Sequence, residues 1–252
     1  MGFVYPHPDI HVAEDDCTIW RYLTFMKFVA MLNDNALYFS RADKQEDDWE
    51  GVVPKHLLDE MEQLPKPVWL QGKSYAEHFR KIEISRHYLN CWHLSQNECA
   101  AMWSIYGERQ ASIAVRSTVG RFKRSFGPCN VRETGGQSDI VVGNVSYGNH
   151  TAWQPSGDSS GDVYAVSFFI KRPSYSFERE FRAKIDGSDF PSPFPVWEGI
   201  NVTVDLRMLL QSIYVAPRSP DWFKKLVKDV LVKFDFSAVE VIRSELDFPA
   251  YM

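Results

Sequence analysis

Residues 174–185 read Ser-Tyr-Ser-Phe-Glu-Arg-Glu-Phe-Arg-Ala-Lys-Ile, and no other stretch constrains the fold of this chain as strongly. From Phe177 to Ile185 the pattern is typical of a β-strand, whose side chains point alternately to the two faces of a sheet. One face carries Arg179 together with three apolar side chains that we expect in a core: Phe177, Phe181 and Ala183. The other face carries two carboxylates and a guanidinium: Glu178, Glu180 and Arg182. Such a face is either a solvated ladder of charges or the floor of an active site.

Segments typical of strands and helices alternate along the rest of the chain. β-Branched and aromatic runs predict strands at residues 18–22, 36–40, 87–95, 111–115, 140–145, 163–170, 201–205, 212–216 and 239–242. Apolar residues at helical spacing predict helices at 25–32, 55–63, 75–86, 98–106, 118–126, 206–210 and 220–233. Polar loops are expected at 41–51, which is acidic, and at 155–161, which is rich in Ser and Gly. The sequence contains no internal repeat and no abrupt change in composition along the chain. We therefore expect a single α+β domain over residues 1–252, with a split mixed or antiparallel β core flanked by helices.

Charge, cysteine content and hydropathy limit the ligands and the cell compartment that we expect for this chain. A net charge of −5 argues against a surface that holds nucleic acid by charge alone, although a local basic patch is compatible with it. The four cysteines form no CxxC or CxxxC pair, which is typical of reduced thiols. No apolar run approaches the roughly 18 residues that span a bilayer. The N-terminus, Met-Gly-Phe-Val-Tyr-Pro, lacks the pattern of a signal peptide, so we expect a cytoplasmic protein.

Three polar features fall at the ends of predicted strands: Arg21, Ser95 and the pair Glu178 and Glu180. Each has an ordinary structural interpretation. An arginine at a strand end is usually a surface charge, and a serine before a helix is usually a cap or turn residue. A Glu-x-Glu beside an arginine is usually a solvated cross-strand ladder.

Together the three features suit cleavage of the bond between nicotinamide and ribose in NAD. That reaction passes through an oxocarbenium-like sugar, as glycoside cleavage does, so it needs an anion near the ribose. It also needs a fixed cation for the phosphates or the adenine-side ribose. We expect Glu180 to be the anion and Arg21 the cation, with Ser95 steadying the nicotinamide ribose. Glu178 is then placed to orient or activate an acceptor.

Five motifs resemble, in their order, a large and poorly characterised bacterial family: Ile-Trp-Arg-Tyr-Leu-Thr-Phe, Leu-Tyr-Phe-Ser, Cys-Trp-His-Leu-Ser, Met-Trp-Ser-Ile-Tyr and Phe-Glu-Arg-Glu-Phe-Arg. Members of that family show a His-Tyr-Thr start, an Asn-Asp-Pro-Phe-Glu loop, a Met-Trp-x-x-Tyr helix and a Glu-x-Glu-x-Arg strand. The resemblance covers residues 18–185. The pattern is in turn similar to the ADP-ribosyltransferase superfamily, including toxins that modify nucleic acid or protein in phage defence.

The resemblance implies an ADP-ribosyltransferase type of β core, NAD as the substrate, no metal, and a toxin or anti-phage effector with room for an antitoxin or other neutralising partner. It places Arg21, Ser95 and Glu180 at the first-strand, middle-strand and catalytic positions. It adds three residues to the NAD contacts: Tyr22, Ser40 and Trp103.

The chain departs from the family pattern in two places. Arg21 stands where the family usually has histidine. Transferases of the Arg-Ser-Glu type also have arginine at this position. The Asn-Asp-Pro loop is replaced by Lys-Gln-Glu-Asp-Asp-Trp-Glu at residues 44–50, in which Trp49 and Glu50 match the Phe-Glu of the family. The role of this loop is therefore open.

A basic segment of the chain is a candidate for binding nucleic acid, either as the acceptor of a transferase or as the ligand of a non-enzymatic protein. Four side chains in and before the predicted helix 118–126 are candidates for binding nucleic acid: Arg116, Arg121, Lys123 and Arg124. Together with Lys171 and Arg172 near the site, these four side chains favour RNA or DNA slightly over protein as the acceptor. The negative net charge of the chain argues against a nucleic-acid acceptor. The alternative is a non-enzymatic nucleic-acid-binding module of a defence or toxin locus, which uses the same side chains with Arg132 and binds less tightly as salt rises. The sequence shows no HExxH, GxxxxGK[ST] or GxGxxG motif.

Overall fold

The computed structural model describes residues 4–70, 72–78, 82–107, 111–149, 163–188, 190 and 197–247. Most of its strands belong to one mixed sheet: β1 (Val4–Pro6), β2 (Thr18–Thr24), β3 (Ala36–Arg41), β4 (His87–Leu94), β5 (Ser112–Thr118), β6 (Asn130–Val131), β7 (Gly136–Gln137), β8 (Ile140–Asn144), β11 (Glu180–Asp186), β12 (Gly199–Thr203), β13 (Ser212–Val215) and β14 (Glu240–Arg243). A separate parallel pair consists of β9 (Ser146–Tyr147) and β10 (Ile170–Lys171).

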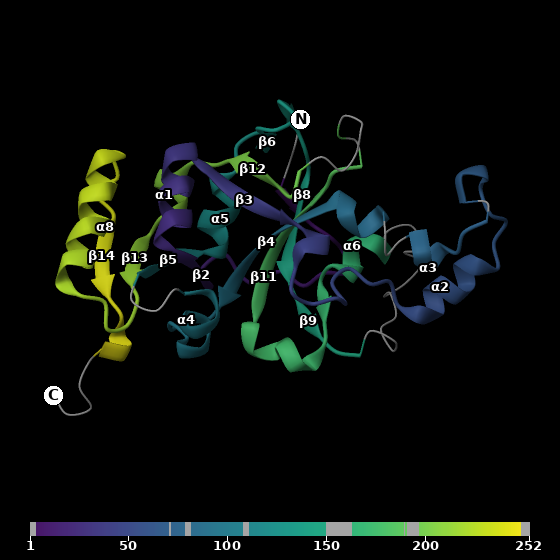
Figure 1. Cartoon of the computed structure of the whole chain (residues 1–252), viewed down its shortest axis with the longest axis horizontal. Helices are drawn as coiled ribbons and strands as arrows, with labels where there is room; N and C mark the ends of the chain where they lie inside the picture. The colour runs from purple at the N-terminus through teal and green to yellow at the C-terminus, as the bar shows by residue number, and fades with distance from the viewer. Residues whose placement is uncertain are drawn as a thin grey trace.

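Helices flank this sheet (Figure 1). The α-helices are α1 (Phe25–Asp34), α2 (Lys55–Glu62), α3 (Tyr75–His78), α4 (Ala100–Tyr106), α5 (Val119–Ser125), α6 (Val163–Ser167), α7 (Leu206–Leu209) and α8 (Asp221–Lys233). Short 3₁₀ helices are η1 (Ala42–Lys44), η2 (Val68–Leu70), η4 (Ile84–Arg86), η5 (Pro173–Glu178) and η6 (Glu245–Asp247). In Figure 1, α8 lies at one end of the molecule and α2 and α3 lie at the other, with β4 and β11 near the middle. The predicted α+β class is confirmed.

The sheet divides at β4. Its order is β14-β13-β5-β2-β4-β3-β12-β6-β7, and β11, β8 and β1 continue it from β4. One edge of β4 pairs with β11 over residues 180–186. The other edge is shared, because β3 pairs with residues 88–89 of β4 and β2 pairs with residues 93–94. β2 and β3 therefore diverge over the middle of β4, and the predicted split of the β core is confirmed.

The helix α1 connects the two diverging strands. The hydroxyl of Thr24 accepts a hydrogen bond from the backbone N–H of Lys27 and so caps the helix. Asn35 ends it in the left-handed conformation, with φ of 44°, which asparagine tolerates better than most residues. Phe28 and Leu32 lie on the inner face and are fully buried. This packing fixes α1 against the sheet beside the opening between β2 and β3.

An aromatic cluster packs against one face of β4 and β11, the face that is turned towards α5. The ring of Phe122, on α5, lies with its centroid 5.5 Å from that of Trp92 on β4 and 5.5 Å from that of Phe181 on β11, both edge-to-face. All three side chains are at most 1% exposed. Because the inner faces of both strands are held in this way, their outer faces are free to carry polar groups.

The central stretch differs from its prediction in one respect. The strand begins at Glu180 rather than at Phe177, because residues 173–178 form η5 and Arg179 has a left-handed φ of 42°. Phe181 and Ala183 are in the core as expected, but Phe177 is 43% exposed, so its predicted place in the core is wrong. Pro173 explains the difference, since proline favours the first turn of a helix.

Two other predicted elements differ from the structure. Residues 163–167, expected as part of a strand, form α6, and of that run only Ile170 is in a strand, β10. Val166, Phe168, Phe169 and Ile170 of this run pack in a second core cluster, and this tertiary packing overrides their β propensity. Within the predicted helix 75–86, residues 75–78 form α3 and residues 84–86 form the 3₁₀ helix η4. Residues 79–81 and the Ser/Gly-rich loop at 155–161 lie outside the described residues. In the described part of the chain, no helix is both long and apolar enough to cross a bilayer.

Candidate active site

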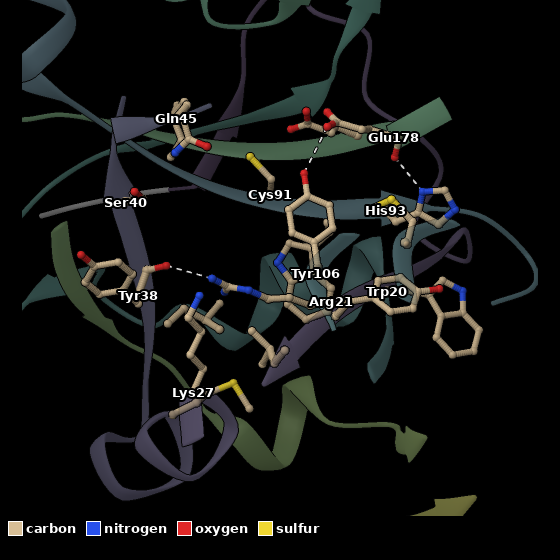
Figure 2. Close-up of a pocket in the computed structure, with 18 of the residues that line it drawn as sticks. Trp20, Arg21, Lys27, Tyr38, Ser40, Gln45, Cys91, His93, Tyr106 and Glu178 are labelled. Atoms are coloured by element: carbon tan, nitrogen blue, oxygen red, sulfur yellow. Dashed lines mark hydrogen bonds between the residues drawn. The ribbon is translucent and has the colours of Figure 1, made fainter. Parts of the chain in front are cut away.

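A cavity of about 750 Å³ opens where β2 and β3 diverge over β4. This volume is in the range of about 300–1,000 Å³ that is usual for small-molecule sites. Its polar lining comes from segments far apart in sequence: Arg21, Tyr22, Lys27, Asp34, Tyr38, Ser40, Gln45, Cys91, His93, Tyr106, Lys171, Glu178, Glu180 and Asn201. The split of the sheet thus makes the cavity, and both predicted glutamates and the predicted arginine line it. Figure 2 labels Glu178 and Arg21 among the lining side chains.

Glu178 and Glu180 meet at a single ammonium group. The Nζ atom of Lys171 lies 2.5 Å from Oε2 of Glu178 and 2.6 Å from Oε1 of Glu180. The hydroxyl of Tyr106 donates a hydrogen bond of 3.1 Å to Oε1 of Glu178, as Figure 2 shows. Glu178 and Glu180 are only 4% and 6% exposed. A solvated ladder of charges is therefore excluded, and these carboxylates form one wall of the cavity.

Behind Glu180 lies a second, deeper ion pair. Nη2 of Arg182 donates to Oε2 of Glu180 at 2.8 Å, and Nε of the same guanidinium donates at 3.1 Å. Arg182 also pairs with Glu50. Arg182 is fully buried and Glu50 is 3% exposed. The acidic loop 41–51 therefore reaches the site, because Glu50 holds the guanidinium that holds Glu180.

The two glutamates are driven towards different protonation states. Burial raises the pKa of Glu178 to about 7, and the neighbouring charge of Glu180 adds to this effect. Burial opposes the charge on Glu180 as well, but Arg182 and Lys171 outweigh it and hold the pKa of Glu180 well below its usual range. Glu180 is therefore a permanent anion, while Glu178 exchanges a proton near neutral pH. Environments that separate a pair of carboxylates in this way are typical of an acid–base site.

Hydrogen bonds to β4 and to Tyr147 fix the backbone around Glu178 and Glu180. Nδ1 of His93 donates to the carbonyl of Glu178 at 2.6 Å, which Figure 2 also shows. The N–H of Leu94 donates to the carbonyl of Arg179 at 2.8 Å. The N–H of Glu180 donates to the hydroxyl of Tyr147 at 2.8 Å. Both carboxylates are thus held on rigid elements, as a preorganised site requires.

Arg21 marks a second, cationic part of the cavity. It lies in the middle of β2 rather than at its end, and its Nη2 donates to the carbonyl of Tyr38 at 3.0 Å. Its guanidinium carbon is 6.0 Å from the ring centroid of Trp92. Burial lowers the pKa of Arg21 to about 10, so it stays charged at neutral pH. Lys27, at the start of α1, lines the same cavity, so two cations are available for phosphates.

The other predicted NAD contacts fall into two groups. Tyr22 and Ser40 line the cavity, whereas Ser95 and Trp103 are not among its lining residues. Ser95 lies in the turn after β4, where its hydroxyl accepts from the N–H of Asn97. Trp103 packs edge-to-face on Tyr22, with ring centroids 4.9 Å apart. Ser95 thus makes the contact of a turn residue and Trp103 supports a residue of the cavity wall, while an NAD contact by either stays a prediction.

The predicted nucleic-acid side chains are largely engaged within the protein. Lys123 and Arg124 pair with Asp15 at 2.5 and 3.0 Å. Arg121 donates to two backbone carbonyls, and the guanidinium of Arg116 lies 5.8 Å from the ring centroid of Trp20. These contacts lower the positive potential that α5 and β5 present. A nucleic-acid role for these four residues stays a prediction.

Several residues of the site were not expected as such from the sequence. Lys171 and Tyr106 contact Glu178 directly, and Glu50 acts through Arg182. Tyr106 stands at the end of the Met-Trp-Ser-Ile-Tyr motif, and Glu50 matches the glutamate of the family loop, so both carried a signal. Lys171 was expected near the site as a cation that favours nucleic acid, but not as the partner of both glutamates. Among the described residues, no three His, Cys, Asp or Glu side chains come together as metal ligands.

Comparisons with known proteins find likeness in structure only. No family model and no curated protein sequence matches the chain. One similar solved structure is the Thermus sp. 2.9 DarT in complex with ADP-ribosylated ssDNA, with 9% sequence identity and a TM-score of 0.41, covering 95% of this chain and 100% of that one. Another is the same DarT in complex with carba-NAD+, with 9% identity and a TM-score of 0.41, covering 93% and 98%. At this level of likeness, the roles of individual residues in those structures do not transfer to this chain.

Proposed function

We propose that this chain is an NAD-dependent ADP-ribosyltransferase that places ADP-ribose on a macromolecule, with nucleic acid slightly favoured over protein. The observation that carries the proposal is the cavity at the split of the sheet, which combines a buried permanent anion, Glu180, with a fixed cation, Arg21. NAD has the matching parts, since its nicotinamide ribose becomes positively charged during cleavage and its two phosphates are anionic.

Glu180 supplies the electrostatic part of the reaction. When the bond between the ribose C1′ and the nicotinamide nitrogen breaks, the electron pair leaves with neutral nicotinamide and the ribose becomes oxocarbenium-like. A fixed carboxylate beside that ribose stabilises the developing charge. Arg182 and Lys171 hold Glu180 in place. Their positive charges weaken the electrostatic potential of the carboxylate at the ribose, but they also keep the carboxylate from rotating away.

Glu178 supplies the proton transfer. The acceptor attacks C1′ with a lone pair, and the proton it loses goes to the Glu178 carboxylate. A base for this step works best with a pKa near the operating pH, and the pKa of Glu178 is raised to about 7. The Tyr106 hydroxyl and the Lys171 ammonium orient the carboxylate by their hydrogen bonds.

Arg21 and Lys27 would bind the dinucleotide phosphates, and Tyr22, Tyr38 and Ser40 would line its path. Arg21 is fixed by the carbonyl of Tyr38, so little conformational freedom is lost when a phosphate binds.

With NAD as substrate and nucleic acid as acceptor, we place the protein in the cytoplasm. We extend the proposal to a toxin or anti-phage effector, for which expression of active protein would arrest growth and the Glu180→Gln protein would not.

The test is release of nicotinamide from NAD by the purified protein, with and without added nucleic acid. We expect release by the wild type, and a strong decrease in Arg21→Ala and Glu180→Gln. Arg207→Ala is the matched control for loss of an arginine, since Arg207 is an exposed residue of α7 and does not line the cavity. No release and no thermal shift with NAD would reject the transferase and leave the non-enzymatic nucleic-acid-binding module as the better explanation.

A further inference from the structure

A row of aromatic side chains lies exposed beside the acidic wall of the cavity. Trp49, in the acidic loop, is 42% exposed, and Phe177, on η5, is 43% exposed. Tyr175 stands next to Phe177, with ring centroids 6.5 Å apart and planes inclined by 29°. Exposed rings gathered in one place are a common mark of an interaction surface.

Arg172 joins the two aromatic segments. Its guanidinium carbon lies 5.8 Å from the ring centroid of Trp49 and 5.4 Å from that of Tyr175. Its Nη2 pairs with Asp47 at 2.5 Å, and the Asp47 side chain is only 1% exposed. The guanidinium is therefore anchored between the rings, with 41% of the Arg172 side chain exposed. We name Trp49, Arg172, Tyr175 and Phe177 the aromatic platform.

The aromatic platform is continuous with the proposed active site. Nζ of Lys171 lies 5.0 Å from the ring centroid of Tyr175, and the same atom contacts both Glu178 and Glu180. Phe177 directly precedes Glu178 in η5. A flat group stacked on Tyr175 or Phe177 therefore places its covalent neighbours close to the carboxylate proposed as the base.

The chemistry of the platform favours a nucleobase over a peptide. Rings alternating with a guanidinium plane are the usual surface on which unpaired bases stack. Cation–π contacts with arginine add to such stacking. Because Arg172 is already neutralised by Asp47, and the chain has a net charge of −5, phosphate contacts contribute little here. Binding through the platform is therefore expected to depend weakly on salt, unlike binding through a basic patch.

We propose that the aromatic platform binds an unpaired base of a single-stranded nucleic acid and so presents a nucleotide to Glu178. The transfer step rests on the proposed function, but the binding step does not. Duplex nucleic acid is excluded as a ligand of this surface, because its bases are stacked on one another and their faces are covered.

The experiment measures fluorescence anisotropy of short labelled single-stranded DNA, single-stranded RNA and duplex DNA, without NAD, at low and high salt. We expect a single strand to bind and the duplex not to bind. Phe177→Ala and Trp49→Ala should each weaken binding by roughly 5- to 150-fold, the usual effect of losing one stacked base. The control is Trp222→Ala, because Trp222 is an aromatic residue on α8 that is 65% exposed and should not affect binding. Thermal unfolding checks that each variant is folded.

Three outcomes would overturn the inference: equal affinity of Phe177→Ala and wild type, an equal loss in Trp222→Ala, or binding of the duplex as tightly as of the single strand. Failure of every oligonucleotide to bind would also overturn it and favour a protein acceptor. Nicotinamide release without an acceptor is measured in parallel on the wild type and on Trp222→Ala, and the two should be equal. Absence of release from the wild type would reject the proposed function while leaving the binding result in force.

Discussion

Glu180 contacts two buried cations, so its replacement tests catalysis and stability together. We expect Glu180→Gln to lower nicotinamide release by about 100- to 1000-fold, the usual effect of removing one preorganised electrostatic group. The neutral amide also leaves Lys171 and Arg182 with a weaker partner, and we expect the free energy of unfolding to fall by about 3 kcal/mol or more. Release is therefore measured at a temperature where chemical denaturation shows both proteins folded.

Glu198 provides the matched control for this substitution. It pairs with Lys44 at 3.3 Å, but its side chain is 79% exposed. A surface pair of this kind adds little to stability. Glu198→Gln should therefore match the wild type in release and in unfolding. If Glu180→Gln also matched it in release, the catalytic assignment of Glu180 would be wrong.

Glu178 should give the transfer reaction its dependence on pH. Because burial and Glu180 raise the pKa of Glu178 to about 7, its carboxylate is largely protonated below that pH and largely ionised above it. A general base must be ionised, so the rate of transfer to the acceptor should rise as the pH rises through about 7 and then level off. Glu178→Gln should lose that rise while still releasing nicotinamide. A pH profile of the variant that kept the same rise would show that another group is the base.

Among the elements, η5 is the one whose conformation decides where the acceptor side of the site lies. Arg179 ends it with a φ of 42°, a strained conformation for a residue with a side chain. A β-branched residue is strained further there, so Arg179→Val should lower the free energy of unfolding by about 1–2 kcal/mol and reduce transfer by shifting Glu178. Arg218, with a φ of 62°, is the control, because Arg218→Val should cost similar stability without affecting transfer. Equal loss of transfer in both variants would contradict this role of η5.

The elements also show what the sequence could and could not predict. The strand–helix–strand unit over β2, α1 and β3 was predictable, because its caps and apolar spacing are local signals. The Val-rich segment that forms α6 was not, because its helical state depends on packing in the cluster around Phe168. The exposure of Phe177 was likewise hidden, since alternation alone gives no sign that Arg179 breaks the strand.

At the scale of the whole molecule, the site depends on a pairing that no local pattern encodes. Glu50 and Arg182 lie 132 positions apart in sequence, yet they form a buried ion pair behind Glu180. From the sequence, the 41–51 loop had an open role and Arg182 was one charge on a strand face. Only the fold shows that the loop contributes to the same network as the Glu-x-Glu-x-Arg strand. Arg21 and Glu180, in contrast, were predicted to lie together from the charges that NAD cleavage would require, and both line the cavity.

The split sheet leads to a prediction about the molecule as a whole. A dinucleotide in the cavity would contact β2, β3 and β4 together and so join the two branches of the sheet. In Glu180→Gln protein, which should bind NAD without consuming it, NAD at about 100 times its dissociation constant should raise the free energy of unfolding by about 2.7 kcal/mol. Amide hydrogen exchange should slow in β2, β3 and β4 and stay unchanged in α8, which lies at the far end of the molecule (Figure 1). The double variant with Arg21→Ala should lose both effects. Equal protection in α8 would place NAD elsewhere, because a ligand confined to the split contacts no residue of that helix.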